Sequence, residues 1–185
     1  MHTSTIVILA LIVLLVVAAA VIIAERRKSA RLRSRFGPEY ARAVQDAGSR
    51  HAAEAALHQR EKRVNSFTLR PLAPADRERY AAAWRRIQAQ FVDNPRDAVT
   101  RADQLLAEVM TMRGYPDSDI EQRTADLSVH HPVLVQSYRS AQDIATRHLR
   151  GEAGTEDLRQ AMLHYRALFD DLIDQAAEAP LRAAS

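Results

Sequence analysis

The chain has 185 residues, 47% hydrophobic and 26% charged, an ordinary composition that excludes wholesale disorder and leaves room for one anchor plus one compact domain. It contains no cysteine, which excludes disulfides, thiolate nucleophiles and cysteine-ligated metals. The formal net charge of +3 divides into +6 for residues 25–63 and −3 for residues 64–185, so we expect no nucleic-acid partner for the slightly acidic C-terminal part.

The first feature along the chain is an apolar run over residues 6–24, which contains only Ile, Val, Leu and Ala. As a helix this run would measure about 28 Å, close to the roughly 30 Å thickness of the bilayer hydrocarbon. It is longer than the about 7–15 apolar residues of a cleaved signal peptide, and no Lys or Arg precedes it. The sequence therefore predicts a single-pass transmembrane helix, in an anchor segment that covers residues 1–35.

Six basic residues follow the apolar run: Arg26, Arg27, Lys28, Arg31, Arg33 and Arg35. Because Lys and Arg close to a span are retained on the cytoplasmic side, we expect the N-terminus outside and the rest of the chain in the cytoplasm, at the inner (plasma) membrane. The same six side chains are candidate contacts for lipid headgroups, each contributing about 1 kcal/mol with anionic lipid. A plain stop-transfer signal is favoured over specific lipid recognition as the role of these residues.

Residues 36–69 are predicted to form a membrane-proximal helical stalk and a linker. Gly37-Pro38 marks a break, and Pro38 suits the first turn of a new helix. Gly48-Ser49 marks a second break, after which Ser49 would cap a helix that runs to about residue 64. The apolar face of this helix is expected at Ala52, Ala56 and Leu57.

Residues 70–179 are predicted to form an antiparallel bundle of four or five helices, followed by a polar tail at 180–185. Asn94 is the expected cap of one helix, Gly114 the left-handed C-terminal cap of the same helix, and Thr155 the cap of the last helix. Apolar residues at helical spacing are the expected core: Tyr80, Trp84, Ile87, Phe91, Val92, Val99, Ala102, Leu105, Leu106, Val109, Met110, Val135, Tyr138, Ala141, Ile144, Ala145, Leu149, Leu158, Met162, Tyr165, Phe169, Leu172 and Ile173. No segment alternates with the period of a strand, so the whole chain is expected to be all-α.

Two groups of polar residues are candidate sites. His130 and His131 are adjacent, whereas two ligands on a helix need a spacing of three or four, so helix-end or surface roles are favoured over metal binding. Acidic patches at residues 170, 171 and 174 and at residues 117, 119 and 121 are expected to be solvated faces or partners of a helix dipole. With no glycine-rich phosphate loop and no nucleophile motif, the sequence predicts no catalytic, cofactor-binding or metal-binding residue and no cofactor.

Several strings after the anchor, at residues 35–40, 91–95, 113–116, 126–132 and 164–166, resemble an uncharacterised bacterial family of small single-pass membrane-anchored helical proteins. The resemblance implies an anchored helical fold and transfers no activity. We therefore expect a non-enzymatic interaction or scaffold module that binds a protein partner or self-associates. The alternative is an anchored ligand-sensing or catalytic domain.

Overall fold

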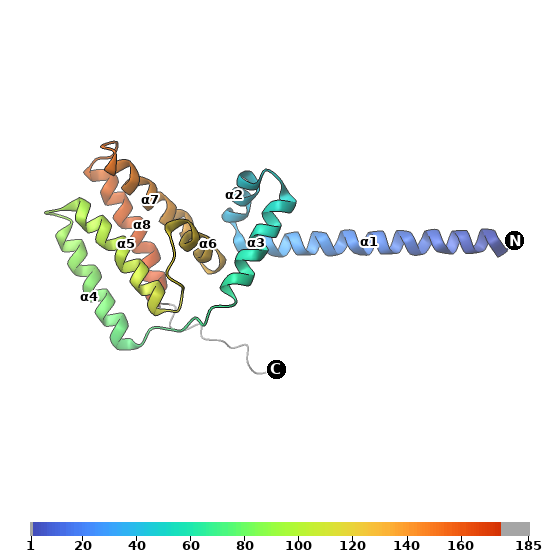
Figure 1. The fold of residues 1–185 in the computed structure, drawn as a ribbon, viewed down its shortest axis with the longest axis horizontal. Coiled ribbons are helices and arrows are strands. Elements are labelled where there is room, and N and C mark those ends of the chain that lie inside the picture. Colours follow the sequence, from blue (N-terminus) through green and yellow to red (C-terminus); the bar gives the residue numbers. More distant parts are fainter. Residues whose placement is uncertain (1, 175–185) are drawn as a thin grey trace. The chain divides into compact units, whose positions relative to one another are not determined.

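The computed structural model describes the backbone of residues 2–174 and the side chains of residues 11–174. Residues 2–174 form eight helices and no strand, so the all-α prediction is confirmed (Figure 1). The helices are α1 (His2–Phe36), α2 (Pro38–Ala47), α3 (Arg50–Val64), α4 (Pro74–Gln90), α5 (Pro95–Met112), α6 (Ile120–His130), α7 (Leu134–Leu149) and α8 (Thr155–Asp174).

The chain divides into two compact units, residues 1–58 and 59–185, and the division falls inside α3. Residues 36–58, which the sequence assigns to a stalk, belong to the first unit. Residues 59–69, which the sequence assigns to the stalk and linker, belong to the second.

Two breaks turn the chain within the first unit, and both lie where the sequence predicts them. Gly37 has a φ of 48° between α1 and α2, and Pro38 takes the first position of α2, where its missing N–H has no helical partner to lose. Gly48 has a φ of 67° after α2, and Ser49 Oγ accepts a hydrogen bond of 3.2 Å from the N–H of Ala52. Ser49 therefore caps α3 as expected.

The first unit has a small core of its own, which the sequence analysis did not anticipate. Phe36, Ala53 and Leu57 are fully buried, together with most of Leu32 and Tyr40. The predicted face of α3 was wrong in part, since Ala52 and Ala56 are exposed and the buried apolar side chains between residues 52 and 57 are Ala53 and Leu57. Residues four apart share one face of a helix, so a shift of one position turns a different face inward.

The apolar run lies in α1, which continues without a break through the basic residues to Phe36. The large apolar side chains between residues 11 and 23 are between 51% and 71% exposed. Within the described part of the chain, no helix combines the length and the apolar character that crossing a membrane requires. Residues 6–10 of the predicted span have side chains outside the described range, which leaves fourteen apolar residues from Leu11 to Ala24.

The second unit is a helical bundle, as predicted, and its described part contains the five helices from α4 to α8. α8 packs against α5 and α7, α4 packs against α5, and α6 packs against α7. Trp84 on α4 is 1% exposed and stacks on Phe169 of α8, with ring centroids 4.7 Å apart and ring planes 21° apart. The core role predicted for Trp84 is therefore confirmed.

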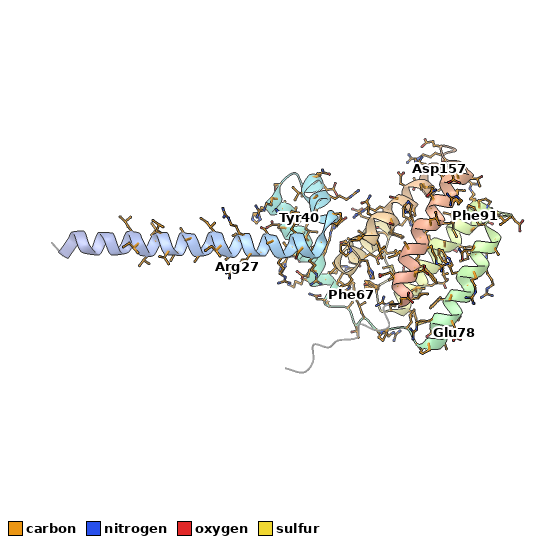
Figure 2. All side chains as sticks on the ribbon, turned by 180° about the vertical axis from the view of Figure 1, so that it is seen from behind. Arg27, Tyr40, Phe67, Glu78, Phe91 and Asp157 are labelled. Atoms are coloured by element: carbon orange, nitrogen blue, oxygen red, sulfur yellow. The ribbon has the colours of Figure 1, made fainter. Side chains whose placement is uncertain are left out.

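The turn between α4 and α5 confirms one cap and corrects one core residue. Asn94 Oδ1 accepts a hydrogen bond of 3.2 Å from the N–H of Asp97, so Asn94 caps α5. Val92 was predicted to be buried and is 83% exposed, because α4 ends at Gln90 and residue 92 lies in the turn. Phe91, labelled at this turn in Figure 2, packs partly against the core.

Gly114 ends α5 with the predicted positive φ, which is 97°. The N–H of Tyr115 donates a hydrogen bond of 3.0 Å to the carbonyl of Met110, closing the end of the helix. A Cβ at residue 114 would lie 2.4 Å from the backbone oxygen of Thr68, so the segment before α4 passes directly over this glycine. Glycine is required there for two reasons, its φ and the close approach.

The last two helices correct two further predictions. Leu149 was expected inside and is exposed at the end of α7, where no helix of the unit covers the final residue. Thr155 was expected to cap α8, but α8 begins at Thr155 itself, and the N–H of Leu158 donates to the carbonyl of Gly154. Gly154 therefore occupies the cap position. The predicted tail at residues 180–185 lies outside the described residues.

Candidate functional site

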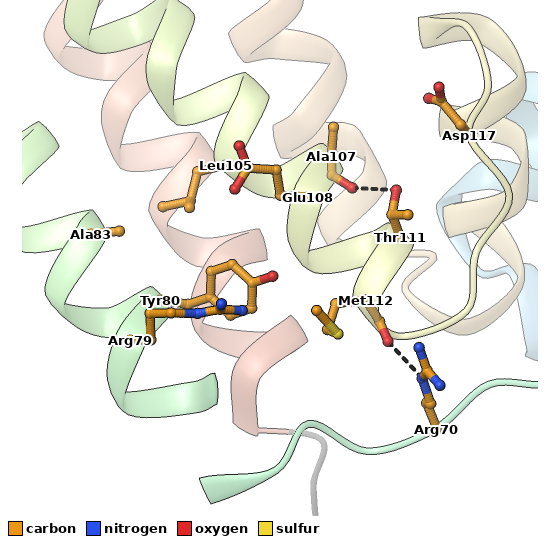
Figure 3. Close-up of a pocket in the computed structure, with 10 residues that line it drawn as sticks. All are labelled: Arg70, Arg79, Tyr80, Ala83, Leu105, Ala107, Glu108, Thr111, Met112 and Asp117. Carbon is orange, nitrogen blue, oxygen red and sulfur yellow. Dashed lines mark hydrogen bonds between the residues drawn. The ribbon is translucent and has the colours of Figure 1, made fainter. Parts of the chain in front are cut away.

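A groove between α4 and α5 in the second unit has a volume of about 700 Å³ (Figure 3). Its side chains come from α4, from α5 and from the segments that flank them. They are Arg70, Arg79, Tyr80, Ala83, Leu105, Ala107, Glu108, Thr111, Met112 and Asp117. The inner wall is therefore apolar, whereas the rim carries charge of both signs.

A second hollow of about 340 Å³ continues the groove toward the other end of the same two helices. It shares Ala83, Leu105 and Glu108 with the first hollow and adds Arg86 and Arg101. We call the two together the α4–α5 groove. The lining on α4 runs from residue 79 to residue 90, which at 1.5 Å per residue is a length of about 16 Å.

Positive charge outweighs negative charge on the rim of the α4–α5 groove. Arg70 is held in place because its Nε donates a hydrogen bond of 2.9 Å to the carbonyl of Met112 (Figure 3). Arg79 is held by Asp76 at 3.0 Å and by the ring of Tyr80, whose centroid lies 4.8 Å from the guanidinium carbon. A guanidinium has five N–H donors, so both arginines keep donors available for a bound group.

A polar network inside the bundle joins α5, α6 and α7. The hydroxyl of Tyr138 donates a hydrogen bond of 3.0 Å to Asp103 Oδ1, to which Gln142 Nε2 also donates at 2.6 Å. Arg123 Nη1 donates to the hydroxyl of Tyr138 at 3.2 Å and lies 3.8 Å from Asp103 Oδ2. Burial raises the pKa of Asp103, although these hydrogen bonds and the Arg123 charge oppose the rise. Burial likewise raises the pKa of Tyr138 to about 12.

A second polar cluster lies where α6 ends and α8 passes. His131 has the helix-end position that the sequence predicts as one of two alternatives, because it is the C-cap residue of α6. It is not at the surface, since it is only 3% exposed and its Nδ1 pairs with Asp171 Oδ2. Asp171, expected on a solvated face, is thus a partner of a buried imidazole. Asp126 is 1% exposed and accepts hydrogen bonds from Arg63 Nε at 3.1 Å and Gln122 Nε2 at 2.8 Å.

The remaining polar residues that the sequence singled out are dispersed. His130 Nδ1 lies 3.2 Å from the hydroxyl of Tyr115, and Asp119 caps α6 by accepting from the N–H of Gln122 at 2.8 Å. Asp170 pairs with Arg166 on its own helix. Over the described residues, no group of three or more His, Cys, Asp or Glu side chains is placed to hold a metal ion.

The predicted lipid-contact residues all lie on α1 in the first unit. Arg26, Arg27, Lys28, Arg31 and Arg33 are exposed, and Arg35 is half-buried. Arg33 lies over the ring of Tyr40, with its guanidinium carbon 5.2 Å from the ring centroid.

A pocket of about 490 Å³ lies beside this basic stretch, between α1 and the start of α3. We call it the α1–α3 pocket, and it is lined by Glu25, Lys28, Arg50, His51, Glu54 and Ala55. The hydroxyl of Tyr40 and the Nε of Arg50 donate to Glu54 Oε1 at 2.7 and 2.9 Å, and Arg50 Nη2 donates to Ser29 Oγ. Burial by itself raises the pKa of Glu54, but these hydrogen bonds and the Arg50 charge outweigh it and lower the pKa to about 2.

Comparison of the chain with known protein families, with curated proteins and with solved structures finds no match in any of the three. The family resemblance inferred from the sequence therefore stays a prediction.

Sequence-based reasoning missed both the α4–α5 groove and the pairing of the carboxylates of Glu54, Asp126 and Asp171. The groove is lined by residues of two helices, and no local sequence pattern reports how two helices are placed. The pair Arg50 and Glu54 could have been found, because a spacing of four places them side by side on one helix. The contacts of Asp126 and Asp171 join residues 63 and 40 positions apart, which the sequence pattern does not encode.

Proposed function

We propose that this chain is a membrane-anchored interaction module, in which α1 inserts into the membrane and the α4–α5 groove binds an acidic amphipathic helix of a partner protein. The observation that carries the proposal is the α4–α5 groove, with an apolar wall between arginine-bearing rims. The proposed location is the inner membrane, with the bundle in the cytoplasm. The family resemblance agrees with such an anchored helical protein.

Two observations support the anchor. The apolar run of residues 6–24 contains no charged or polar residue, and its described side chains are exposed on α1. Exposed Leu, Ile and Val at consecutive positions are stabilised in lipid and costly in water, by about 25 cal/mol per Å² of apolar surface. The six basic residues that follow favour retention of residues 38–185 in the cytoplasm.

The proposed occupant of the α4–α5 groove follows from its length and charge. A length of about 16 Å corresponds to three turns of a bound helix, enough for apolar anchors at spacings of three, four and seven. The rim carries Arg70, Arg79, Arg86 and Arg101 against Glu108 and Asp117. A net positive rim is complementary to Asp and Glu flanking the apolar anchors.

The alternative function, ligand sensing or catalysis, would use the clustered carboxylates and histidines. Asp126 and His131 are almost completely enclosed, so a substrate could reach them only if the bundle opened. Asp103 is already engaged by Tyr138 and Gln142. These groups therefore support a packing role more than a reactive one.

Site-specific photo-crosslinking of the full-length protein in native membranes tests the groove. A photoreactive residue at Ala83 should capture a segment that mass spectrometry identifies as a helix with Asp or Glu beside apolar residues. A matched probe at Leu163, exposed on α8 and outside the groove lining, should capture nothing specific. Arg79→Glu with Arg101→Glu should abolish the capture, whereas Arg150→Glu should not. Capture of a second copy of this chain, or equal capture at both positions, would overturn the proposed partner.

A reporter fused after Ser185 tests the anchor and its orientation. Activity of a cytosolic fluorescent reporter and resistance of the chain to alkaline extraction would agree with the proposal. Activity of an alkaline phosphatase fusion, which needs export, would contradict the cytoplasmic assignment. Release of the protein by alkaline extraction would contradict insertion itself.

A further inference from the structure

We propose that the α1–α3 pocket binds one phospholipid headgroup, a phosphodiester that carries a primary ammonium group, as in phosphatidylethanolamine. The inference rests on the proposed insertion of α1 and adds a specific ligand to it. It uses the first unit alone.

The position of the pocket along α1, just beyond the apolar run, agrees with a headgroup ligand. Lys28 follows Ala24, the last residue of the apolar run, by four positions, or about 6 Å along a helix. The polar layer on each side of the hydrocarbon is about 5–8 Å thick. Because Arg50 donates a hydrogen bond to Ser29, the start of α3 is held at the same level of α1. The pocket would therefore lie within the headgroup layer.

The basic wall of the pocket suits a phosphodiester. Lys28 and Arg50 line it from different helices. Arg50 uses Nε for Glu54 and Nη2 for Ser29, which fixes the guanidinium and leaves further N–H donors. Arg50 and His51 also form the first turn of α3, whose positive end favours an anion. The pocket therefore offers several hydrogen-bond donors to one phosphate group.

The acidic wall distinguishes an ammonium-bearing headgroup from a purely anionic one. Arg50 and Glu54 balance each other's charge, and so do Lys28 and Glu25, which makes the pocket formally neutral when His51 is neutral. A neutral pocket is complementary to a zwitterion. Glu25 and Lys28 are three residues apart, which places their Cβ atoms about 5–6 Å apart, a separation that a short ethanolamine link can bridge. A primary ammonium donates three hydrogen bonds to a carboxylate, whereas the trimethylammonium of choline donates none.

Native mass spectrometry of the full-length protein in mild detergent tests this assignment. The probes are phosphatidylethanolamine, phosphatidylcholine and phosphatidylglycerol with identical acyl chains. We expect retention of phosphatidylethanolamine over phosphatidylcholine by about fivefold, the size expected of one partly exposed ion pair. Glu25→Gln should remove that preference, and Lys28→Gln should weaken retention of both lipids. Arg27→Gln, exposed on α1 and outside the pocket lining, is the matched control and should change neither.

Three results would overturn the assignment: equal retention of the two lipids by the wild-type protein, a preference that survives Glu25→Gln, or stronger retention of phosphatidylglycerol. Water-soluble glycerophosphoethanolamine at equal concentration should fail to displace the lipid; full displacement would identify a soluble ligand and overturn the lipid assignment. Alkaline extraction of the same variants separates the two proposals. Inserted protein without a headgroup preference rejects only this inference, whereas protein that does not insert rejects the proposed function.

Discussion

Replacing Gly114 by alanine should destabilise the second unit more than any other Gly→Ala change in it. Two separate costs combine. A non-glycine residue at a φ of 97° is strained by about 1–2 kcal/mol. In addition, the new Cβ would lie 2.4 Å from the backbone oxygen of Thr68, a distance at which the backbone must move.

Movement of the backbone at Thr68 would weaken two hydrogen bonds, because they tie this segment to the end of α5. The N–H of Arg70 donates to the carbonyl of Arg113 and its Nε donates to the carbonyl of Met112, both at 2.9 Å. Each is worth about 0.5–1.5 kcal/mol. We therefore expect Gly114→Ala to lower the free energy of unfolding by about 2–5 kcal/mol in all.

Gly151→Ala is the matched control, since Gly151 has a similar positive φ of 76° but nothing within 4 Å of an added Cβ. It should cost only the about 1–2 kcal/mol of backbone strain. Urea unfolding of the full-length protein in mild detergent would compare the midpoints of the two variants. Fluorescence of Trp84, the single tryptophan, would report on the bundle core. Equal midpoints for the two variants would refute the close approach of Thr68.

Three further changes test other parts of the structure. Trp84→Ala should cost about 3–5 kcal/mol, because it empties a fully buried site stacked on Phe169; an unchanged melting curve by circular dichroism would contradict this. The pKa of Glu54 is lowered from 4.5 to about 2, so its contribution to stability is complete above pH 4.5 and is lost as the pH falls toward 2. Glu54→Gln should flatten that part of the pH dependence of thermal unfolding, and an unaltered profile would show that the carboxylate is not the group responsible. Replacing all six basic residues between Arg26 and Arg35 with glutamine should scramble the orientation of a C-terminal reporter without preventing insertion; a retained orientation would reject the charge argument.

The sequence by itself determined several helix boundaries, although it misplaced the start of α8 and the end of α4. Pro38, Asn94, Pro95 and Gly114 act through their own backbone geometry or through a hydrogen bond to a residue three positions away, so their effect is independent of the rest of the fold. The buried face of α5 was equally readable, because all six of its predicted apolar residues lie on one stripe and are buried.

The tertiary structure decided which surfaces meet. The alanine-rich face of α3 offers nearly equal alternatives, and only packing within the first unit selects Ala53 and Leu57 over Ala52 and Ala56. Asp170, Asp171 and Asp174 on α8 look alike in sequence, yet only the tertiary structure pairs Asp171 with the buried His131. The α4–α5 groove and the α1–α3 pocket likewise depend on the separation of two helices. Such separations result from the packing of many side chains at once, and no local pattern of residues encodes them.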